Sequence, residues 1–322
     1  MYYYKQKNQR IKKKMKLRKY IPVGFIILII GLLLSCGDNK PLSEKKTVIC
    51  TTNVIADAIS NILPPDFEVK SLMGPGVDPH TYKSKTSEIK NMKNADVIVY
   101  NGIDFESNLI DAIEEIGKSG FVISLGDLVP KDRLRKTTDF GSAYDPHFWH
   151  DVNLFSTSVS IAGSQLSVKF PDSKNYIDSA TNSYTKKLLE TESYVRSEIA
   201  KIPSNARVLI TAHDAFGYFG RSFGIEVKGI QGISTASDIS IRGITELTDF
   251  IVSRGIPAIF VENSVSQKNI KSVIEGCQSK GLNLSIGGTL YSDGLGDTES
   301  GADTYIKMIR KNTNAIVGGL GK

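Results

Sequence analysis

Histidine is scarce in this 322-residue chain, and the positions of its four histidines are informative. Two of them, His147 and His150, lie in the stretch YDPHFWHD together with the single tryptophan. His80 ends a GPGVDPH segment, His213 lies in TAHDAF, and Asp293 lies in YSDG. Imidazole and carboxylate groups are ligands of divalent transition metals, so these residues are candidates for a metal site.

The spacing of these residues relative to apolar runs predicts that four of them meet. His80 and His147 follow the apolar runs at 67–70 and 121–125 in the first half of the chain. His213 and Asp293 follow the runs at 207–212 and 282–286 in the second half. Ligands of parallel α/β sheets bind beyond the carboxyl ends of the strands. Three neutral imidazoles and one carboxylate can hold a divalent metal in a cleft between two lobes. Nitrogen-rich ligation favours zinc, and the carboxylate also suits manganese or iron.

Each of these residues also has an ordinary interpretation. A single loop histidine is usually solvated or hydrogen-bonded, and Asp-Gly is a common turn. His147 and His150 could also bind together as an i, i+3 pair. We favour His147 alone, because Asp145-Pro146 is typical of a helix start and His150 would lie one turn inside, where capping or packing with Trp149 explains it.

The elements that must position these residues recur in two similar series. Short β-branched apolar runs, each followed by turn residues and a helical pattern, lie at 47–52, 67–70, 95–100 and 121–125, and again at 207–212, 225–228, 257–261 and 282–286. This pattern predicts an α/β protein with two similar lobes, 48–172 and 203–322, each a mainly parallel four-stranded sheet with flanking helices.

One long rigid helix is expected to join the lobes over residues 173–202. Residues 173–200 contain no glycine or proline, and their apolar residues recur at steps of three, four or seven. A helix of about 28 residues is roughly 42 Å long, which is enough to run along both lobes and to limit hinge motion.

The N-terminal region predicts export and a lipid anchor. A basic segment precedes 14 apolar residues at 21–34, which is short for a membrane-spanning helix and typical of a signal peptide. The run ends in LLSC, which resembles a bacterial lipobox. We therefore expect a signal peptide at 1–35, acylation of Cys36 and a flexible tether over 36–47, with translation starting at Met1 or Met15.

The charge of the remaining chain excludes some partners. The formal net charge is +6, but nine basic residues precede position 20, and the rest of the chain carries 31 basic and 34 acidic residues, a net charge of −3. With no basic cluster beyond the signal region, nucleic-acid binding is disfavoured. No G-x-x-x-x-G-K-[ST] motif is present, so the chain is not expected to hydrolyse ATP itself. Cys50 and Cys277 could pair or remain buried free thiols.

Longer motifs carry a resemblance to a known family. DPH followed by TY at 78–82, DPHFW at 145–149, the segment 211–238 and YSDGLGD at 291–297 resemble the metal-binding solute receptors of ABC transporters, most closely the TroA-like branch. The resemblance implies two α/β lobes joined by one helix, with His80, His147, His213 and Asp293 at the ligand positions. Manganese-specialised relatives have glutamate in place of His213, and many dedicated zinc receptors have a histidine-rich loop that this chain lacks. A zinc site, or a broad zinc, manganese and iron site, is therefore implied.

The leading hypothesis is a monomeric, lipid-anchored receptor outside the cytoplasm. It would capture one divalent metal ion and deliver it to an ABC permease and its ATPase. A metallohydrolase is the enzyme alternative, but catalytic zinc sites usually have three protein ligands and an open position for water. Four protein ligands therefore favour a receptor over an enzyme. A surface adhesin is a further alternative, although no feature of the sequence marks an adhesive surface.

Overall fold

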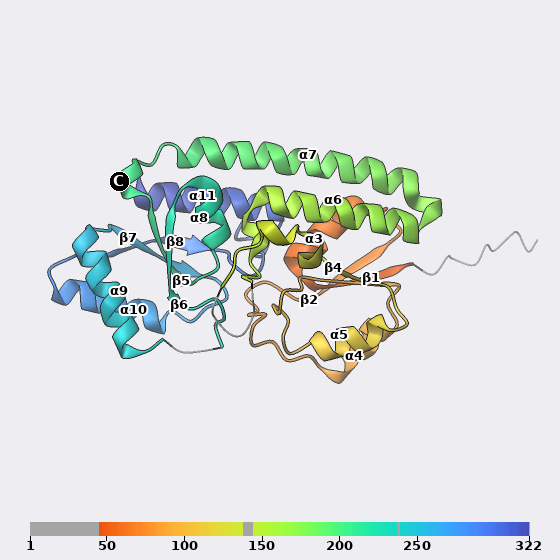
Figure 1. Ribbon diagram of the computed structural model, residues 1–322, viewed down its shortest axis with the longest axis horizontal. Coiled ribbons are helices and arrows are strands. Elements are labelled where there is room, and N and C mark those ends of the chain that lie inside the picture. Colours follow the sequence, from red (N-terminus) through yellow and green to blue (C-terminus); the bar gives the residue numbers. More distant parts are fainter. Residues whose placement is uncertain (1–44, 138–143, 237–238, 322) are drawn as a thin grey trace, which may run out of the picture. The chain divides into compact units, whose positions relative to one another are not determined.

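The structure is a computed structural model that describes residues 45–137, 144–236 and 239–321 (Figure 1). Residues 46–322 form one compact unit. The predicted signal peptide, the acylation site Cys36 and most of the tether lie outside the described residues, and the first strand begins at Thr47. Within the described ranges, no helix combines the length and apolar character needed to cross a membrane.

The first lobe contains one parallel four-stranded sheet. Its strand order is β2-β1-β3-β4, from β1 (Thr47–Thr52), β2 (Glu68–Met73), β3 (Val97–Tyr100) and β4 (Val122–Ser124). Val48 and Cys50 of β1 face the cluster that contains α3 (Asn53–Ile62) and α6 (Val152–Lys169), whereas Ile49 faces α4 (Thr86–Lys93) and α5 (Ile110–Gly117). Because side chains alternate along a strand, an apolar run is buried on both faces of the sheet.

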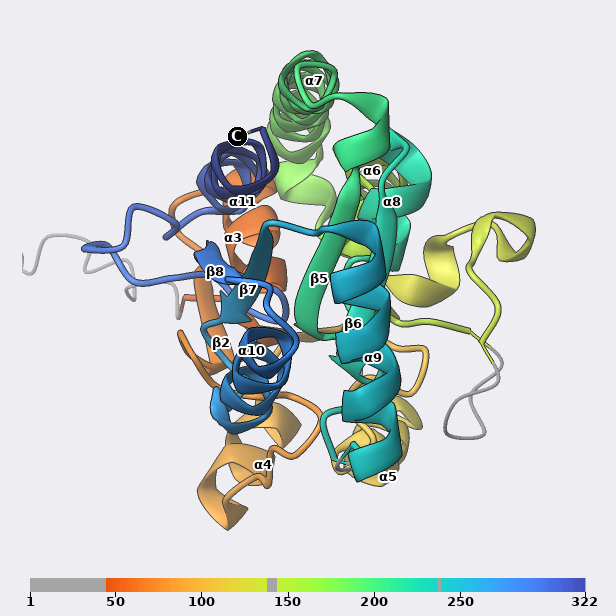
Figure 2. The same ribbon diagram turned by 90° about the vertical axis from the view of Figure 1, so that its left-hand side faces the viewer.

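The second lobe also has four strands between two helical layers. Its elements are β5 (Val208–His213), α8 (Gly217–Phe223), β6 (Glu226–Gln231), α9 (Ile241–Arg254), β7 (Ala258–Glu262), α10 (Lys268–Ser279), β8 (Ser285–Leu290) and α11 (Tyr305–Leu320). Helices α8 and α11 lie on one side of the strands, and α9 and α10 on the other (Figures 1 and 2). A strand is present at each of the eight predicted positions, although β8 begins three residues later than predicted and extends to Leu290. The two-lobe α/β fold is confirmed.

The second lobe differs from the prediction in how its strands pair. Instead of one four-stranded sheet, β5 pairs with β6 and β7 with β8, in two separate parallel pairs. Strands β5 and β7 are neighbours without a continuous ladder. At their carboxyl ends the backbone N–H of His213 donates to Glu262 Oε1 at 3.0 Å. A side chain therefore takes the place of a backbone partner where the two pairs meet.

A 26-residue helix, α7 (Lys174–Ile199), lies within the predicted 173–202 segment. Its buried residues include Ile177, Tyr184, Leu188, Val195 and Ile199, whose alternating steps of seven and four place them on one face of the helix. That face packs on α3 and α6 of the first lobe and on α8 and α11 of the second. These side chains belong to one apolar cluster that draws residues from both lobes, so the lobes share part of their core.

The two cysteines of the described residues are separate. Cys50 on β1 and Cys277 on α10 are both free and buried, which answers the question of whether they pair. Burial raises the pKa of both thiols. Because the thiolate is the reactive form, both side chains act as small apolar residues.

Gly229 on β6 is required by a close approach of backbone. A Cβ atom there would lie 2.3 Å from the Asp214 nitrogen and 2.5 Å from the His213 carbonyl carbon. Gly229→Ala is therefore expected to lower the free energy of unfolding by about 1–3 kcal/mol, because backbone atoms must move. Chemical denaturation would measure this, with Gly318→Ala as the control, since a Cβ at Gly318 has no neighbour within 4 Å. Equal stability of the two variants would contradict this reading.

Candidate metal centre

Four buried side chains converge where the carboxyl ends of the strands of the two lobes meet. One ligand atom from each of His80, His147, His213 and Asp293 lies within 4.8 Å of every other. His147 Nε2 is 3.3 Å from His80 Nε2 and 3.4 Å from Asp293 Oδ1, and His213 Nε2 is 3.3 Å from Asp293 Oδ2. The structure therefore brings together all four residues that the sequence singled out.

Local structure fixes the direction of each side chain. His213 is the last residue of β5, and Asp293 lies in the loop after β8. His80 lies in the loop after β2, where its backbone N–H donates to Asp78 Oδ1 at 3.0 Å. His147 precedes a single 3₁₀ turn, Phe148–His150, and not the α-helix itself. Helix α6 begins later, at Val152, with Asp151 as its N-cap.

Two carboxylates orient the imidazoles from outside the cluster. Asp145 Oδ1 lies 2.7 Å from His147 Nδ1, and Glu262 Oε2 lies 2.6 Å from His213 Nδ1. A carboxylate accepts only, so each Nδ1 carries a hydrogen and each Nε2 is directed into the cluster, where its lone pair can bind a metal once the ring is neutral. Arg135 Nη1 donates to the other oxygen of Asp145. The pKa of Asp145 is lowered despite burial, first by the hydrogen bond and charge of His147 and then by the charge of Arg135.

Burial and mutual charge set the pKa values of the four groups in opposite directions. Burial dominates at His80, whose pKa falls to about 3. At His147 burial is outweighed by the hydrogen bond with Asp145 and by the nearby carboxylate of Asp293, so the pKa of His147 is raised. At His213 the charge of Asp293 outweighs burial, and the pKa is raised well above 6.5. The pKa of Asp293 is correspondingly held well below its usual range, against burial, mainly by the charge of His213.

The donor set fits a divalent transition metal. Metal–ligand bonds of about 2.0–2.1 Å at tetrahedral angles separate the donors by roughly 3.3 Å, close to the distances observed here. Two donors, His213 Nε2 and Asp293 Oδ1, are buried without a hydrogen-bond partner. Buried polar atoms normally have a hydrogen-bond partner. These two atoms have none, and a cation bound at the centre of the cluster would supply the missing interaction.

His150 does not join the cluster. Its Nε2 lies 3.0 Å from the carbonyl oxygen of Ser292, and its ring packs on Phe216 with 4.3 Å between ring centroids. The i, i+3 alternative therefore does not describe the structure. His150 is buried and packed near Trp149, and Asp151 provides the helix cap.

Two other acidic residues, Asp78 and Asp214, are sequence neighbours of His80 and His213. Asp78 binds the backbone of His80 and accepts a hydrogen bond from Thr235 Oγ1 at 2.6 Å, which joins the two lobes beside the site. Asp214 lines a separate pocket next to β6, and burial raises its pKa. Of the acids Asp78, Asp145, Asp214 and Glu262, Asp145 and Glu262 are the two that hydrogen-bond to an imidazole ring.

The apolar wall of the site could not be read from the sequence. Phe105 lies edge-on to His80, with 5.0 Å between ring centroids, and also packs on Trp149. Its loop has left-handed backbone at Ile103 and Asp104, a conformation that side chains other than glycine rarely adopt. Burial raises the pKa of Glu106 to about 7, and its carboxyl accepts hydrogen bonds from the loop backbone. The residues FES at 105–107 give no indication of such a loop in the sequence.

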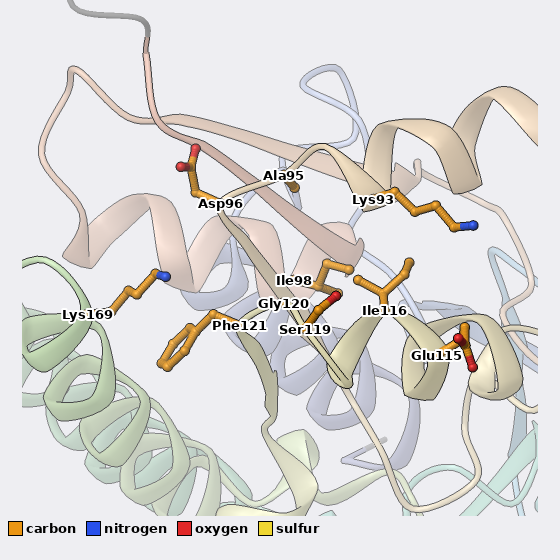
Figure 3. A pocket seen from close by; sticks show the side chains of 10 residues that line it. All are labelled: Lys93, Ala95, Asp96, Ile98, Glu115, Ile116, Ser119, Gly120, Phe121 and Lys169. Atoms are coloured by element: carbon orange, nitrogen blue, oxygen red, sulfur yellow. The ribbon is translucent and has the colours of Figure 1, made fainter.

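A cavity of about 750 Å³ in the first lobe lies away from the cluster (Figure 3). It is lined by residues at the amino ends of β3 and β4, including Ala95, Asp96 and Phe121, with Lys169 of α6. The four clustered residues lie at the opposite, carboxyl ends of the strands. This cavity is therefore separate from the candidate metal site.

Glu262→Gln is expected to weaken metal binding about 10–100-fold while leaving one site per chain. Glu262 accepts from both the backbone N–H and the Nδ1–H of His213. An amide has one acceptor oxygen, so its NH₂ group would face one of these donors. Metal titration with a competing chelator measures the change, with Glu246→Gln on the exposed face of α9 as the control. Wild-type affinity in Glu262→Gln would contradict an orienting role.

Comparisons with known proteins identify the family of this chain. A family model described as zinc-uptake complex component A, periplasmic, matches residues 48–319. The manganese-binding lipoprotein MntA of Bacillus subtilis is 39% identical over 287 residues, which cover 88% of this chain and 94% of the relative. The zinc-binding protein TroA of Treponema pallidum is 38% identical over 288 residues, covering 89% and 91%.

The fold agrees as well. The solved structure of periplasmic zinc-binding TroA from Treponema pallidum matches with a TM-score of 0.83 at 38% identity, covering 86% of this chain and 100% of that chain. Sequence, fold and clustered side chains lead to one conclusion. The chain belongs to the ZnuA/TroA-like family of metal-binding solute receptors.

Proposed function

We propose that this protein captures one divalent transition metal ion between its two lobes and delivers it to an ABC permease for import. His80, His147, His213 and Asp293 are the proposed ligands, two from each lobe by sequence. The proposal concerns transport of a bound cargo and involves no catalytic turnover. The observation that carries it is the convergence of four buried donors within 4.8 Å of one another, two of which, His213 Nε2 and Asp293 Oδ1, lack a hydrogen-bond partner.

Zinc is the proposed cargo, with manganese or iron as alternatives. Three imidazole nitrogens favour zinc over manganese by the usual order of affinities. Each oxygen of Asp293 faces a different imidazole, at 3.4 and 3.3 Å, so the carboxylate is placed to bind through one or both oxygens. A fifth donor of this kind would suit metals that prefer higher coordination. The sequence is 39% identical to a manganese-binding relative and 38% identical to a zinc-binding relative, so sequence identity does not select the metal.

The proposed setting is the outer face of the cytoplasmic membrane or the periplasm. Relatives of this chain include lipoproteins, and the lipobox-like LLSC at 33–36 supports acylation of Cys36 after removal of residues 1–35. The receptor would act as a monomer, and a partner ATPase would supply the energy for import. Nucleic acid is not a proposed partner, because the chain after residue 20 has a net charge of −3.

The test is metal stoichiometry on stripped protein that starts at residue 37, followed by zinc-against-manganese competition. One tightly bound ion per chain, weakened in His213→Ala, would support the receptor proposal, and the competition would rank the metals. Absence of metal binding, or binding that His213→Ala leaves unchanged, would overturn the proposed site.

A further inference from the structure

The loop that carries Asp293 belongs by sequence to the second lobe, yet much of its backbone is held by the first. Asn53, the first residue of α3, accepts a hydrogen bond from the Leu295 N–H at 2.8 Å and donates to the Leu295 carbonyl at 3.4 Å. On the other side of Asp293, Asn312 of α11 binds both backbone groups of Tyr291, at 2.9 and 2.8 Å. The loop is therefore fixed at both of its ends by asparagine side chains.

Between these two points, the carbonyl oxygen of Ser292 accepts two hydrogen bonds from the first lobe. Trp149 Nε1 donates at 2.9 Å and His150 Nε2 at 3.0 Å. A carbonyl only accepts, so His150 must carry its hydrogen on Nε2. Ser292 is fully buried, and the two donors are 3% and 0% exposed. These hydrogen bonds fix the plane of the peptide that immediately precedes Asp293.

We propose that Trp149 and His150 are positioning residues that aim the carboxylate of Asp293 at the metal. They lie in the same turn as His147, whose Nε2 is 3.4 Å from Asp293 Oδ1. A rotation of the Ser292–Asp293 peptide would move the carboxylate away from His147 and His213. This inference rests on the proposed metal-binding function and adds two residues that act through Asp293 without touching the cargo.

The anchoring divides the site unequally. The sequence predicts two ligands from each lobe, but the Asp293 loop is held by the first lobe, through Trp149 and His150, as well as by Asn312 of the second. His213 differs, because Glu262 of the second lobe holds both its ring and its backbone.

His150→Phe is the test variant, and His150→Gln is its matched control. Phenylalanine retains an aromatic ring against Phe216 but removes the donor to Ser292, whereas the glutamine amide can place an N–H near the position of Nε2. Zinc affinity should fall about 10–100-fold in the phenylalanine variant at an unchanged one ion per chain, and recover in the glutamine variant. Trp149 is the only tryptophan and lies 5.3 Å from the His147 ring, so its fluorescence can follow binding.

A double-mutant cycle with Asp293→Ala separates positioning from a general structural effect. If His150 acts through Asp293, His150→Phe should cause no further loss of zinc affinity when Asp293 is already alanine. Equal losses in both backgrounds, or wild-type affinity in His150→Phe, would overturn the inference. If His150→Phe fails to fold, Trp149→Phe followed by calorimetry tests the same carbonyl. Failure of the wild-type protein to bind zinc or manganese would instead reject the proposed function itself.

Discussion

His147→Ala should weaken zinc binding roughly 10²–10³-fold. Four-ligand zinc sites have apparent binding free energies of about 10–16 kcal/mol, so one ligand contributes about a quarter, and each 1.4 kcal/mol is tenfold. His147 Nε2 lies 3.3 Å from His80 Nε2 and 3.4 Å from Asp293 Oδ1. Its loss also leaves Asp145 without the imidazole that it orients. Titration of metal-stripped protein against a chelator of known affinity measures the effect.

The control for this variant is Tyr176→Ala, at an exposed position on α7 that is remote from the site by sequence and fold. It should bind zinc like the wild-type protein. Circular dichroism should show that His147→Ala remains folded, because most of the shared core is untouched. Wild-type zinc affinity in a folded His147→Ala protein would remove His147 from the ligand set.

Metal affinity should fall steeply with acidification, by up to about two decades per pH unit, because two imidazoles must lose protons before they bind. The pKa values of His147 and His213 are raised in the metal-free protein, whereas that of His80 is about 3, so His80 is already neutral. Each of the two raised groups contributes at most one released proton. Calorimetry in buffers of different ionisation enthalpy counts the protons, and an affinity independent of pH would contradict this assignment.

The same shifts predict opposite pH trends for stability with and without metal. A raised histidine pKa gives stability that is fully present below 6.5 and is lost as the pH rises through the folded value. The lowered pKa of Asp293 gives stability that is present above 3.8 and lost as the pH falls. The metal-free protein should therefore become less stable as the pH rises above 6.5. Over the same pH range, bound zinc should stabilise the folded protein more strongly. Melting curves with and without zinc would show the two diverging.

Much of this molecule follows from its sequence for identifiable physical reasons. The eight strands could be predicted because each is a short β-branched run bounded by turn residues, and such runs are buried on both faces. His80, His147, His213 and Asp293 could be brought together because parallel strands present their carboxyl ends on one side. Helix α7 could be predicted from a long segment without glycine or proline and with a regular apolar spacing.

The remaining features depend on contacts between distant residues. Glu262 meets His213, 49 positions earlier in the chain, across the gap between β5 and β7, and this contact depends on how the two strand pairs lie side by side. The role of His150 depends on Ser292, 142 positions later in the chain. Phe105 reaches the site through a left-handed backbone at Ile103 and Asp104, which residue propensities disfavour.

The core shared by the two lobes along α7 has a mechanical consequence for the transport cycle. Wide opening would pull apart buried apolar surface, at a cost of about 25 cal/mol for each Å² exposed, so the loaded and empty receptors must have similar outlines. A permease would then have to distinguish them by small displacements of loops around the metal and not by a large change of shape. In such a stiff receptor, the bound metal would change only the local conformation of the loops around it. A docking partner could detect this change only through direct contact with those loops.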